Sequence, residues 1–300
     1  MGKAIVVIVG QTASGKTSLS IKMAKRFDGE VISADSRQVY RELNLCSGKV
    51  TEEEKQGVRH YLLDLVSAKD GVFTAQDFKK FFQKALDEID SHGKLPIVAG
   101  GSGFYIDVAL GKIKLDDIER DKALAEELNS KTTSELQGVL KDVTRQVPEG
   151  LDLNNKIKLI RAIEFAQQGK EFAFKRRSAD IGRRILWIGI KWEKDILRKR
   201  IKTRLKERFE QGMCDEVRQL HKSGVSWERL DALGLEVRYC TQYIQGVLDQ
   251  EAFLEVLENK IWQYAKRQAT YWRQNPEIIW FDAEDTEQIL RFTEENLHKN

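Results

Sequence analysis

The stretch Gly10-Gln11-Thr12-Ala13-Ser14-Gly15-Lys16-Thr17 decides the fold of this 300-residue chain. It has the spacing G-x-x-x-x-G-K-[ST] of a P-loop, in which backbone N–H groups and the N-terminus of the next helix surround phosphate oxygens. The β-branched run Ala4–Val9 lies before the motif and predicts a strand. Leu19, Met23 and Phe27 follow it on one helical face. A P-loop requires a strand before it and a helix after it, so a chance match in an ordinary glycine-rich turn is disfavoured.

Two side chains of this loop have expected roles of their own. Lys16 would contact the outer phosphate oxygens as a point charge, and the Thr17 hydroxyl would be a ligand of Mg²⁺. The remaining loop residues would bind a diphosphate mainly through their backbone. A P-loop alone favours ATP or GTP, so other residues must identify the substrate.

Strands and helices alternate along much of the chain. Glu30–Ser33, Leu95–Ala99 and Ile185–Ile190 read as buried strands, and Ile278–Phe281 as a last one. A helix with an apolar face, from Phe78 on, lies between the second and third strands. This alternation predicts an α/β fold, a P-loop NTPase-like parallel sheet flanked by helices, with a helical C-terminal region.

The segment 117–170 interrupts the alternation, because its apolar residues repeat only at helical spacing. An all-helical block between two strands of a sheet is typical of an insertion. We therefore expect a catalytic core of residues 1–113 and 183–300, and a helical insertion domain of residues 114–182.

Charge is distributed unevenly, although the net charge is only +3. Residues 114–135 have a balance of −3, residues 151–184 one of +5, and residues 194–208 one of +6. Such runs are usually solvated helix faces, but clustered positive charge can also bind a polyanion. Composition alone leaves both readings open.

The chain carries no apolar run near the roughly 20 residues that span a bilayer, and no signal-peptide pattern. We expect a cytoplasmic protein without a membrane partner. Cys46, Cys214 and Cys240 are odd in number and far apart in the sequence. This spacing argues against a disulfide framework or a zinc site and favours reduced thiols.

The segment Ser33–Tyr40 follows the second strand and contains the sequence DSRQVY. Ligands bind at the carboxyl ends of such strands, so Asp35 should point into the same crevice as the P-loop. Its carboxylate could be a magnesium ligand, a general base or an ordinary turn residue. Gly100–Tyr105 forms a second turn of small residues at the same edge, which is weak evidence by itself.

The C-terminal block Tyr264–Arg273 interleaves cations with large aromatic residues. Aromatic rings beside guanidinium groups suit stacked bases and phosphates. We expect Trp262 and Tyr264 to belong to the core, as aromatic residues at helical spacing usually do. The run from Lys266 to Gln268 is hard to explain as core.

Several of these segments together resemble the tRNA dimethylallyltransferases. GQTASGKT, DSRQVY, GGSGFY, RIKTR with GMCDEV, and YAKRQATYWR stand in the order of that family, and the match covers about residues 4–281. The chain departs from it at Gln11, where the family usually has Pro, and at Ser102, where it has Thr. The segment Asn154–Glu164 matches only loosely, and Leu233–Glu236 replaces the commoner Ile-Gly-Tyr pattern.

The resemblance implies transfer of a dimethylallyl group from dimethylallyl diphosphate to N6 of the adenosine immediately 3′ of the anticodon. The P-loop would hold the diphosphate, and Asp35 would take the proton from N6. Charge on the leaving diphosphate would be stabilised by Thr12, Lys16, Arg204, and Thr17 with its Mg²⁺. The insertion would grip the anticodon stem-loop. The residues implied in tRNA binding are Asp35, Ser36, Arg37, Gln38, Ser102, Lys158, Arg161, Lys266, Arg267, Gln268, Thr270 and Arg273.

Three alternatives stay open at this point. An adenylate isopentenyltransferase would share the P-loop and the aspartate but would prenylate free AMP, ADP or ATP. A P-loop nucleotide kinase would use Asp35 to bind metal, and a non-catalytic RNA-binding protein would have retained only the fold. No exposed apolar stripe demands a partner subunit, so we expect a monomer.

Overall fold

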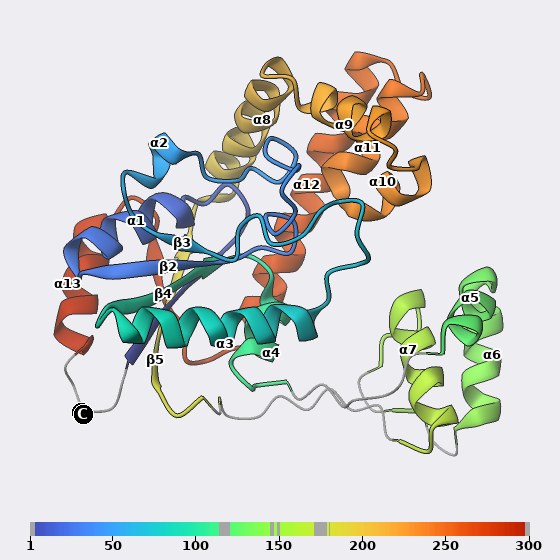
Figure 1. Ribbon diagram of the computed structural model, residues 1–300, viewed down its shortest axis with the longest axis horizontal. Coiled ribbons are helices and arrows are strands. Elements are labelled where there is room, and N and C mark those ends of the chain that lie inside the picture. Colours follow the sequence, from blue (N-terminus) through green and yellow to red (C-terminus); the bar gives the residue numbers. More distant parts are fainter. Residues whose placement is uncertain are drawn as a thin grey trace. The chain divides into compact units, whose positions relative to one another are not determined.

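The computed structural model describes residues 4–113, 121–144, 147–148, 151–170, 179 and 181–297, and the chain divides into two compact units (Figure 1). The larger unit combines Met1–Leu110 with Asp180–Asn300, and the smaller unit is Gly111–Ala179. Each unit has its own hydrophobic core.

Within the described residues, the larger unit is built on one sheet of six parallel strands in the order β3-β2-β4-β1-β5-β6. This confirms the predicted α/β fold. All the strands that the sequence predicts are present, and the short edge strand β3 is additional. The strands are β1 (Ala4–Gly10), β2 (Gly29–Ala34), β3 (His60–Tyr61), β4 (Leu95–Gly100), β5 (Arg184–Lys191) and β6 (Ile279–Asp282).

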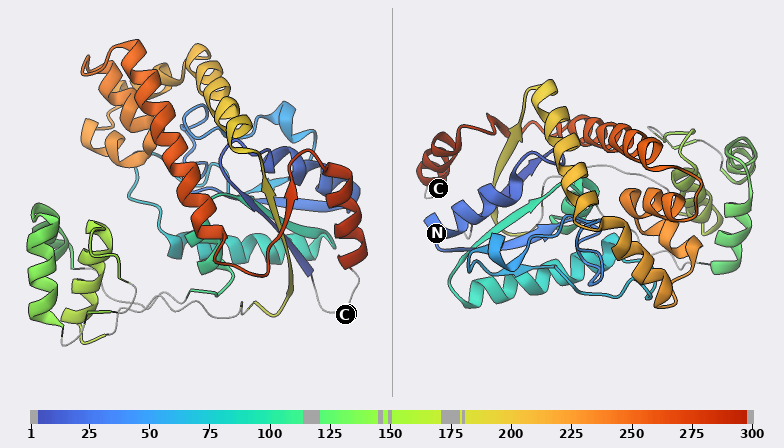
Figure 2. Two further views of the ribbon diagram at one scale, coloured as in Figure 1. Left: turned by 180° about the vertical axis from the view of Figure 1, so that it is seen from behind. Right: turned by 90° about the horizontal axis from the view of Figure 1, so that it is seen from above.

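Helices cover both faces of this sheet (Figures 1 and 2). On one face, α1 and α13 pack on inward side chains of the strands, and on the other lie α3, α4 and α12. The helices of this unit are α1 (Lys16–Arg26), α2 (Glu52–Lys55), α3 (Ala75–Ser91), α4 (Gly103–Ala109), α8 (Lys194–Glu210), α9 (Met213–Lys222), α10 (Trp227–Leu233), α11 (Leu235–Ile244), α12 (Gln250–Trp272) and α13 (Thr286–Leu297).

Alternation along β5 shows how the sequence produces these two layers. Successive strand residues point to opposite faces. Ile188 therefore packs in the core beneath α1, whereas its neighbour Trp187 lies against Trp272 of α12, with ring centroids 6.0 Å apart. Both Trp187 and Trp272 are almost fully buried, so this contact fixes α12 on its face of the sheet.

The turn expected at Gly100–Tyr105 is shorter than predicted. Helix α4 begins at Gly103, so Phe104 and Tyr105 are helical. A Cβ atom at Gly103 would overlap the ring of Tyr271 on α12. The glycine thus allows α12 to approach the start of α4.

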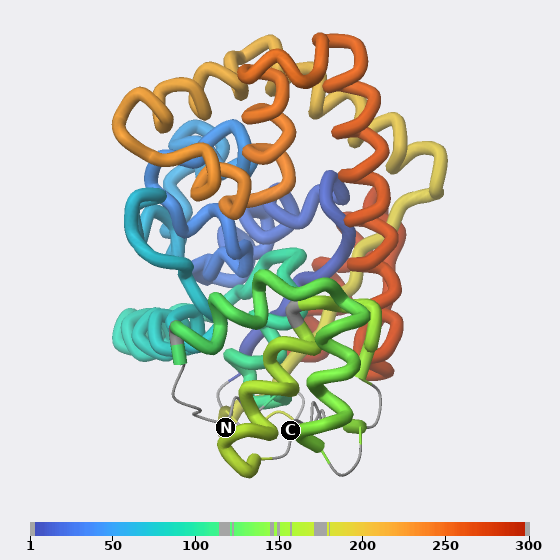
Figure 3. Tube along the Cα trace, turned by 90° about the vertical axis from the view of Figure 1, so that its right-hand side faces the viewer, coloured from blue at the N-terminus to red at the C-terminus, as the bar shows by residue number. Residues whose placement is uncertain are grey.

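Helices α9 to α12 pack on one another beyond the carboxyl ends of the strands. Figure 3 shows the light-blue segment after β2 beside these orange helices. The three thiols that are distant in the sequence meet here: the Sγ atoms of Cys214 and Cys240 are 3.1 Å apart, and all three cysteines are buried and free.

The smaller unit is helical in its described residues, with α5 (Lys122–Ser130), α6 (Thr133–Val143) and α7 (Lys156–Gln167). Capping residues set where these helices begin. The Thr132 hydroxyl accepts the N–H of Glu135 in a capping box, and Asn155 accepts the N–H of Lys158. Leucines and isoleucines of α5, α6 and α7 form the core. Part of the basic run 151–184 lies outside the described residues.

Across the described residues, every helix is either too short or too polar to cross a membrane.

Candidate active site

The P-loop presents an uncapped helix N-terminus. Gly15 precedes α1 in the left-handed conformation, with φ of 94°, and provides no side-chain cap. The first N–H groups of any α-helix lack partners within the helix. At α1 they are consequently available to an anion, and the helix dipole favours negative charge there.

Neighbouring side chains hold the carbonyl groups of the loop. Lys16 Nζ donates to the Gln11 carbonyl at 2.6 Å, Arg200 Nε to that of Ala13 at 2.9 Å, and Trp192 Nε1 to that of Ser14 at 3.0 Å. A peptide N–H points roughly opposite to its own C=O. Fixing these carbonyls therefore fixes the direction of the loop N–H groups.

Helix α12 braces the loop from the far end of the sequence. The Gln268 side chain accepts the Thr12 N–H at 2.7 Å and donates to the Gly101 carbonyl at 3.1 Å. Gln11 Nε2 donates to the Ala265 carbonyl at 3.1 Å. A Cβ atom at Gly101 would overlap Gln268 Nε2, so the glycine leaves room for this amide. The buried Gln268 amide thus joins the P-loop to the end of β4.

A cavity of about 770 Å³ lies over the P-loop at the carboxyl ends of the strands. It brings together most of the residues that the sequence predicts for the site. Gly10 and Gln11 are not among its lining residues, and Gln11 faces α12 instead. The predicted residues that line it are Thr12, Ala13, Ser14, Gly15, Lys16, Thr17, Asp35, Ser36, Arg37, Gln38, Arg204 and Gln268.

Asp35 combines a turn role with a position in the cavity wall. It directly follows β2, and its Oδ1 accepts the N–H of Arg37 at 2.8 Å. In the part of the chain that the structure describes, its second oxygen has no hydrogen-bond partner. One oxygen of Asp35 therefore orients the carboxylate and leaves the other for a ligand.

One face of α8 supplies positive charge opposite the P-loop. Arg200, Arg204 and Arg208 follow one another at intervals of four residues and all line the cavity. Arg204 is the one that the family resemblance identified. Burial lowers the pKa of Arg208, opposed by the nearby Glu236 carboxylate, and the same burial raises the pKa of Glu236.

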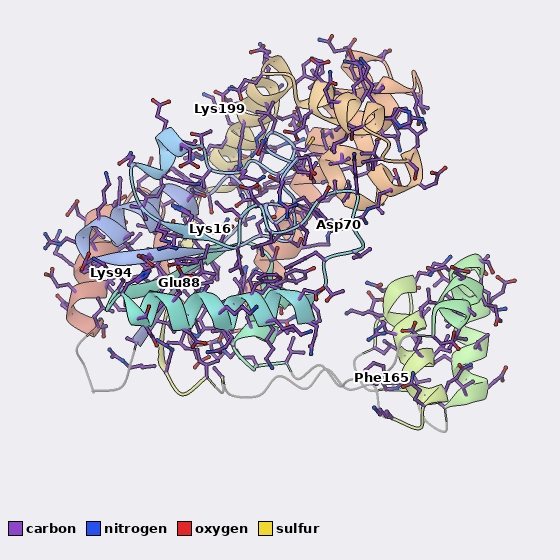
Figure 4. All side chains as sticks on the ribbon, in the orientation of Figure 1. Lys16, Asp70, Glu88, Lys94, Phe165 and Lys199 are labelled. Atoms are coloured by element: carbon purple, nitrogen blue, oxygen red, sulfur yellow. The ribbon has the colours of Figure 1, made fainter. Side chains whose placement is uncertain are left out.

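Lys16, labelled in Figure 4, is the first residue of α1 and lines this cavity. Burial lowers the pKa of its ammonium group to about 8, and the charge of Asp35 partly offsets this effect. A bound diphosphate would favour the charged form of Lys16, because an anion beside the ammonium raises its pKa.

We therefore expect diphosphate affinity to fall as the pH rises through about 8, where Lys16 loses its proton in the free protein. The measurement is calorimetric titration with inorganic pyrophosphate between roughly pH 6.5 and 9.5, a range that brackets this pKa. Lys16→Arg is the matched control, because arginine stays charged throughout while the ligand's own titration affects both proteins equally. Parallel pH profiles for the two proteins would contradict the assignment to Lys16.

Other predicted residues lie outside the cavity lining. Ser102 Oγ accepts the N–H of Ser36 at 3.2 Å, so it supports the turn after β2. Exposed side chains flank Gln268 at the C-terminal end of α12, namely those of Lys266, Arg267, Thr270 and the C-cap residue Arg273. In the smaller unit, Lys158 and Arg161 belong to α7, where Arg161 pairs with the buried Glu164 at 2.6 Å.

Sequence reasoning missed or misplaced several residues of the site. Tyr264, predicted to be core, is 36% exposed and lines the cavity. That prediction was wrong because Tyr264 lies on the side of α12 that faces the P-loop. Gly48, Arg208 and Glu236 also line the cavity. For Arg208 the four-residue spacing from Arg204 was a usable signal, whereas Gly48 and Glu236 had none.

The oxygen atoms at this site suit a Mg²⁺ ion that binds together with a diphosphate. Thr17 contributes a hydroxyl to the cavity wall. Among the described residues, no three His, Cys, Asp or Glu side chains are grouped to hold a metal on their own. Mg²⁺ commonly binds through one or two protein oxygens, substrate phosphates and water. A single hydroxyl beside a phosphate cradle satisfies that pattern.

Comparisons with known proteins agree with this geometry. The family model described as IPP transferase matches residues 38–275. The chain is 36% identical to tRNA dimethylallyltransferase 1 of Syntrophus aciditrophicus, covering 99% of both chains, and 42% identical to tRNA dimethylallyltransferase 2 of Shewanella sediminis, covering 90% of this chain and 88% of that one. The crystal structure of a full-length tRNA isopentenylpyrophosphate transferase from Bacillus halodurans is 30% identical, with a TM-score of 0.74 over 99% of this chain and 97% of that chain. The chain therefore belongs to the IPP transferase family.

Proposed function

We propose that this protein transfers the dimethylallyl group of dimethylallyl diphosphate to N6 of the adenosine immediately 3′ of the anticodon in tRNA. The observation that carries the proposal is the shared cavity. A P-loop cradle, a carboxylate with one free oxygen and a row of arginines all face one space of about 770 Å³. The relatives described above are named tRNA dimethylallyltransferases, which agrees with this proposal.

The reaction joins N6 of adenine to C1 of the dimethylallyl group and breaks the bond from C1 to the diphosphate oxygen. The electron pair of the broken bond leaves with the diphosphate. An aromatic amine is a weak nucleophile, so a base must take its proton as the new bond forms. Asp35 supplies that base, because its free oxygen lies in the cavity and its other oxygen is already oriented by Arg37.

Negative charge grows on the diphosphate during this step, and positively charged groups around the P-loop stabilise it. Lys16, Arg204 and the first N–H groups of α1 act on the leaving group, together with Thr12 on the loop. Fixed donors of this kind stabilise developing charge without reorganising, which is usually the largest catalytic contribution. Thr17 would hold a magnesium ion, whose charge further neutralises the diphosphate.

The tRNA-binding part of the proposal is supported by charge outside the cavity. Lys266 and Arg267 are exposed on α12, and Arg273 is exposed as its C-cap residue; the same helix braces the P-loop through Gln268. Lys158 and Arg161 add cations on α7 of the smaller unit. An adenine in an anticodon loop is stacked, so it must be flipped out at a cost of a few kcal/mol before it reaches Asp35. Contacts to the surrounding phosphates offset that cost.

Salt should weaken the binding of an anticodon stem-loop strongly and that of dimethylallyl diphosphate much less. Each phosphate contact contributes a slope of about −0.7 in log affinity against log salt for single strands. Replacing Lys266, Arg267 and Arg273 together with alanine should flatten the slope by up to about 2, since three contacts are removed. Filter binding across a salt series measures this slope.

The matched control for this experiment replaces Lys79, Lys80 and Lys84 with alanine. These three lysines are exposed on α3 and carry the same total charge. The control should retain the wild-type slope. Equal slopes for the α12 variant and the wild type would assign the α12 cations to ordinary solvated surface.

The function itself is tested by supplying labelled dimethylallyl diphosphate with total tRNA, with AMP or with ATP. Label in tRNA, without any need for ATP, is the expected result. Label in AMP alone would identify an adenylate isopentenyltransferase. ATP turnover matched to phosphorylated product would identify a kinase. Either of the last two outcomes would overturn the proposal.

A further inference from the structure

A carboxylate on α9 holds the loop that closes the cavity. Glu216 Oε2 accepts the N–H groups of Asn44 and Leu45, both at 2.8 Å, and its Oε1 accepts that of Cys46 at 3.0 Å. Three successive backbone donors thus converge on one side chain. Charge-assisted hydrogen bonds of this kind are about twice as strong as neutral ones.

The same loop lines the cavity at Cys46, Ser47 and Gly48. The Gly48 carbonyl accepts Gln38 Nε2 at 3.1 Å and Arg204 Nη2 at 3.5 Å. Gly48 has a φ of 58°, and a Cβ atom there would overlap the guanidinium groups of Arg204 and Arg208. The guanidinium groups of these two arginines therefore pack directly against the loop backbone.

The arginines and the carboxylate that contact this loop come from neighbouring parts of the chain. Arg204 and Arg208 lie on α8, and Glu216 lies in the first turn of α9, which follows directly after Gly212. The carboxylate and the arginines consequently bracket the loop from two consecutive helices. If the loop moved relative to α9, it would also move relative to Arg204 and Arg208.

We propose that Glu216 is a positioning residue: it fixes the loop 44–48 so that Arg204 and Arg208 point at the leaving diphosphate. This inference rests on the proposed function, because it assigns the two arginines to that leaving group. Glu216 itself does not line the cavity. It acts through the Gly48 backbone, and misplacement of a charge-stabilising group by about 1 Å can lower a rate by about 100-fold.

The direct test is Glu216→Gln, which keeps the size but turns an NH₂ group toward backbone donors. We expect kcat/KM for dimethylallyl diphosphate to fall by about 10- to 100-fold. Affinity for tRNA should stay at the wild-type value. Asp215→Asn is the matched control, since its carboxylate is the adjacent one and pairs with Arg218 on the surface. The control should show wild-type kinetics.

A double-mutant cycle separates positioning from a merely structural role. If Glu216 acts through Arg204 and Arg208, the loss caused by Glu216→Gln should be smaller in an Arg204→Ala background than in the wild type, because one of the two arginines is already absent. Additive losses would overturn the inference, as would wild-type kinetics in Glu216→Gln. The proposed function is tested separately, by the assay of the wild-type protein. If the wild type fails to transfer the prenyl group to tRNA, the proposed function is overturned and not this inference alone.

A second variant covers the case in which Glu216→Gln does not fold. Gly48→Ala leaves α9 untouched and presses a methyl group against the arginines. We expect the same loss in kcat/KM, and again a smaller loss in the Arg204→Ala background. Wild-type kinetics in a folded Gly48→Ala variant would show that the loop does not set the arginines, and the inference would be wrong.

Discussion

Replacing Asp35 with asparagine is expected to lower kcat for prenyl transfer by about 10²–10⁴-fold, the usual contribution of a positioned general base. Asparagine has nearly the same size, and its carbonyl oxygen can still accept the Arg37 N–H that orients the side chain. Only proton acceptance is lost. Affinity for tRNA should therefore be nearly unchanged. Single-turnover kinetics with a labelled donor measure the chemical step directly.

The matched control for Asp35→Asn is Glu207→Gln. Glu207 lines the same cavity and is exposed, so the change removes the same charge from the same space. Its turnover should stay close to that of the wild type. Near-normal turnover in Asp35→Asn would remove Asp35 from the role of base and return it to that of a turn residue.

Replacing Lys16 with alanine should lower kcat/KM for dimethylallyl diphosphate by about 10²–10³-fold, as the loss of one buried charge-stabilising donor does in other enzymes. Two effects act together. The ammonium that faces the diphosphate is lost, and so is its 2.6 Å hydrogen bond to the Gln11 carbonyl, which shapes the loop. Steady-state kinetics at fixed tRNA measure the change.

Lys199→Ala is the control for that experiment. Lys199 also lines the cavity, but it is exposed on α8, as Figure 4 shows. A charge in solvent is screened, so its removal should have a much smaller effect than that of the half-buried Lys16. Equal losses in the two variants would mean that the cavity responds to total charge and not to the P-loop lysine.

The sequence predicted the parts of this site that depend on local order. The P-loop is contiguous, and Asp35 follows a recognisable strand, so the rule that ligands lie at carboxyl strand ends placed both in one crevice. Arg208 was within reach of the same reasoning. Its spacing from Arg204 puts it on the same helical face, but within the run 194–208 the family resemblance identified only Arg204.

The remaining contacts depend on how distant elements meet. Gln268 resembles a polar residue in a basic segment, yet its amide is buried between Thr12 and Gly101. Nothing in the sequence around Glu216 indicates that it accepts three N–H groups of a loop 170 residues earlier. Hydrogen bonds of this kind have no periodicity, because tertiary packing alone decides which donor meets which acceptor.

The Gln268 bridge also makes the activity of this protein depend on the synthesis of α12. Thr12 and Gln268 are separated by 256 positions, so the P-loop leaves the ribosome long before the residue that braces it. The first strands can pair while translation continues, since domains begin to fold during synthesis. The phosphate-binding loop can be completed only after α12 has been synthesised. A nascent chain that stops before Gln268 should thus carry an intact GQTASGKT motif and still bind diphosphate poorly, so ribosome-bound fragments would not sequester the prenyl donor.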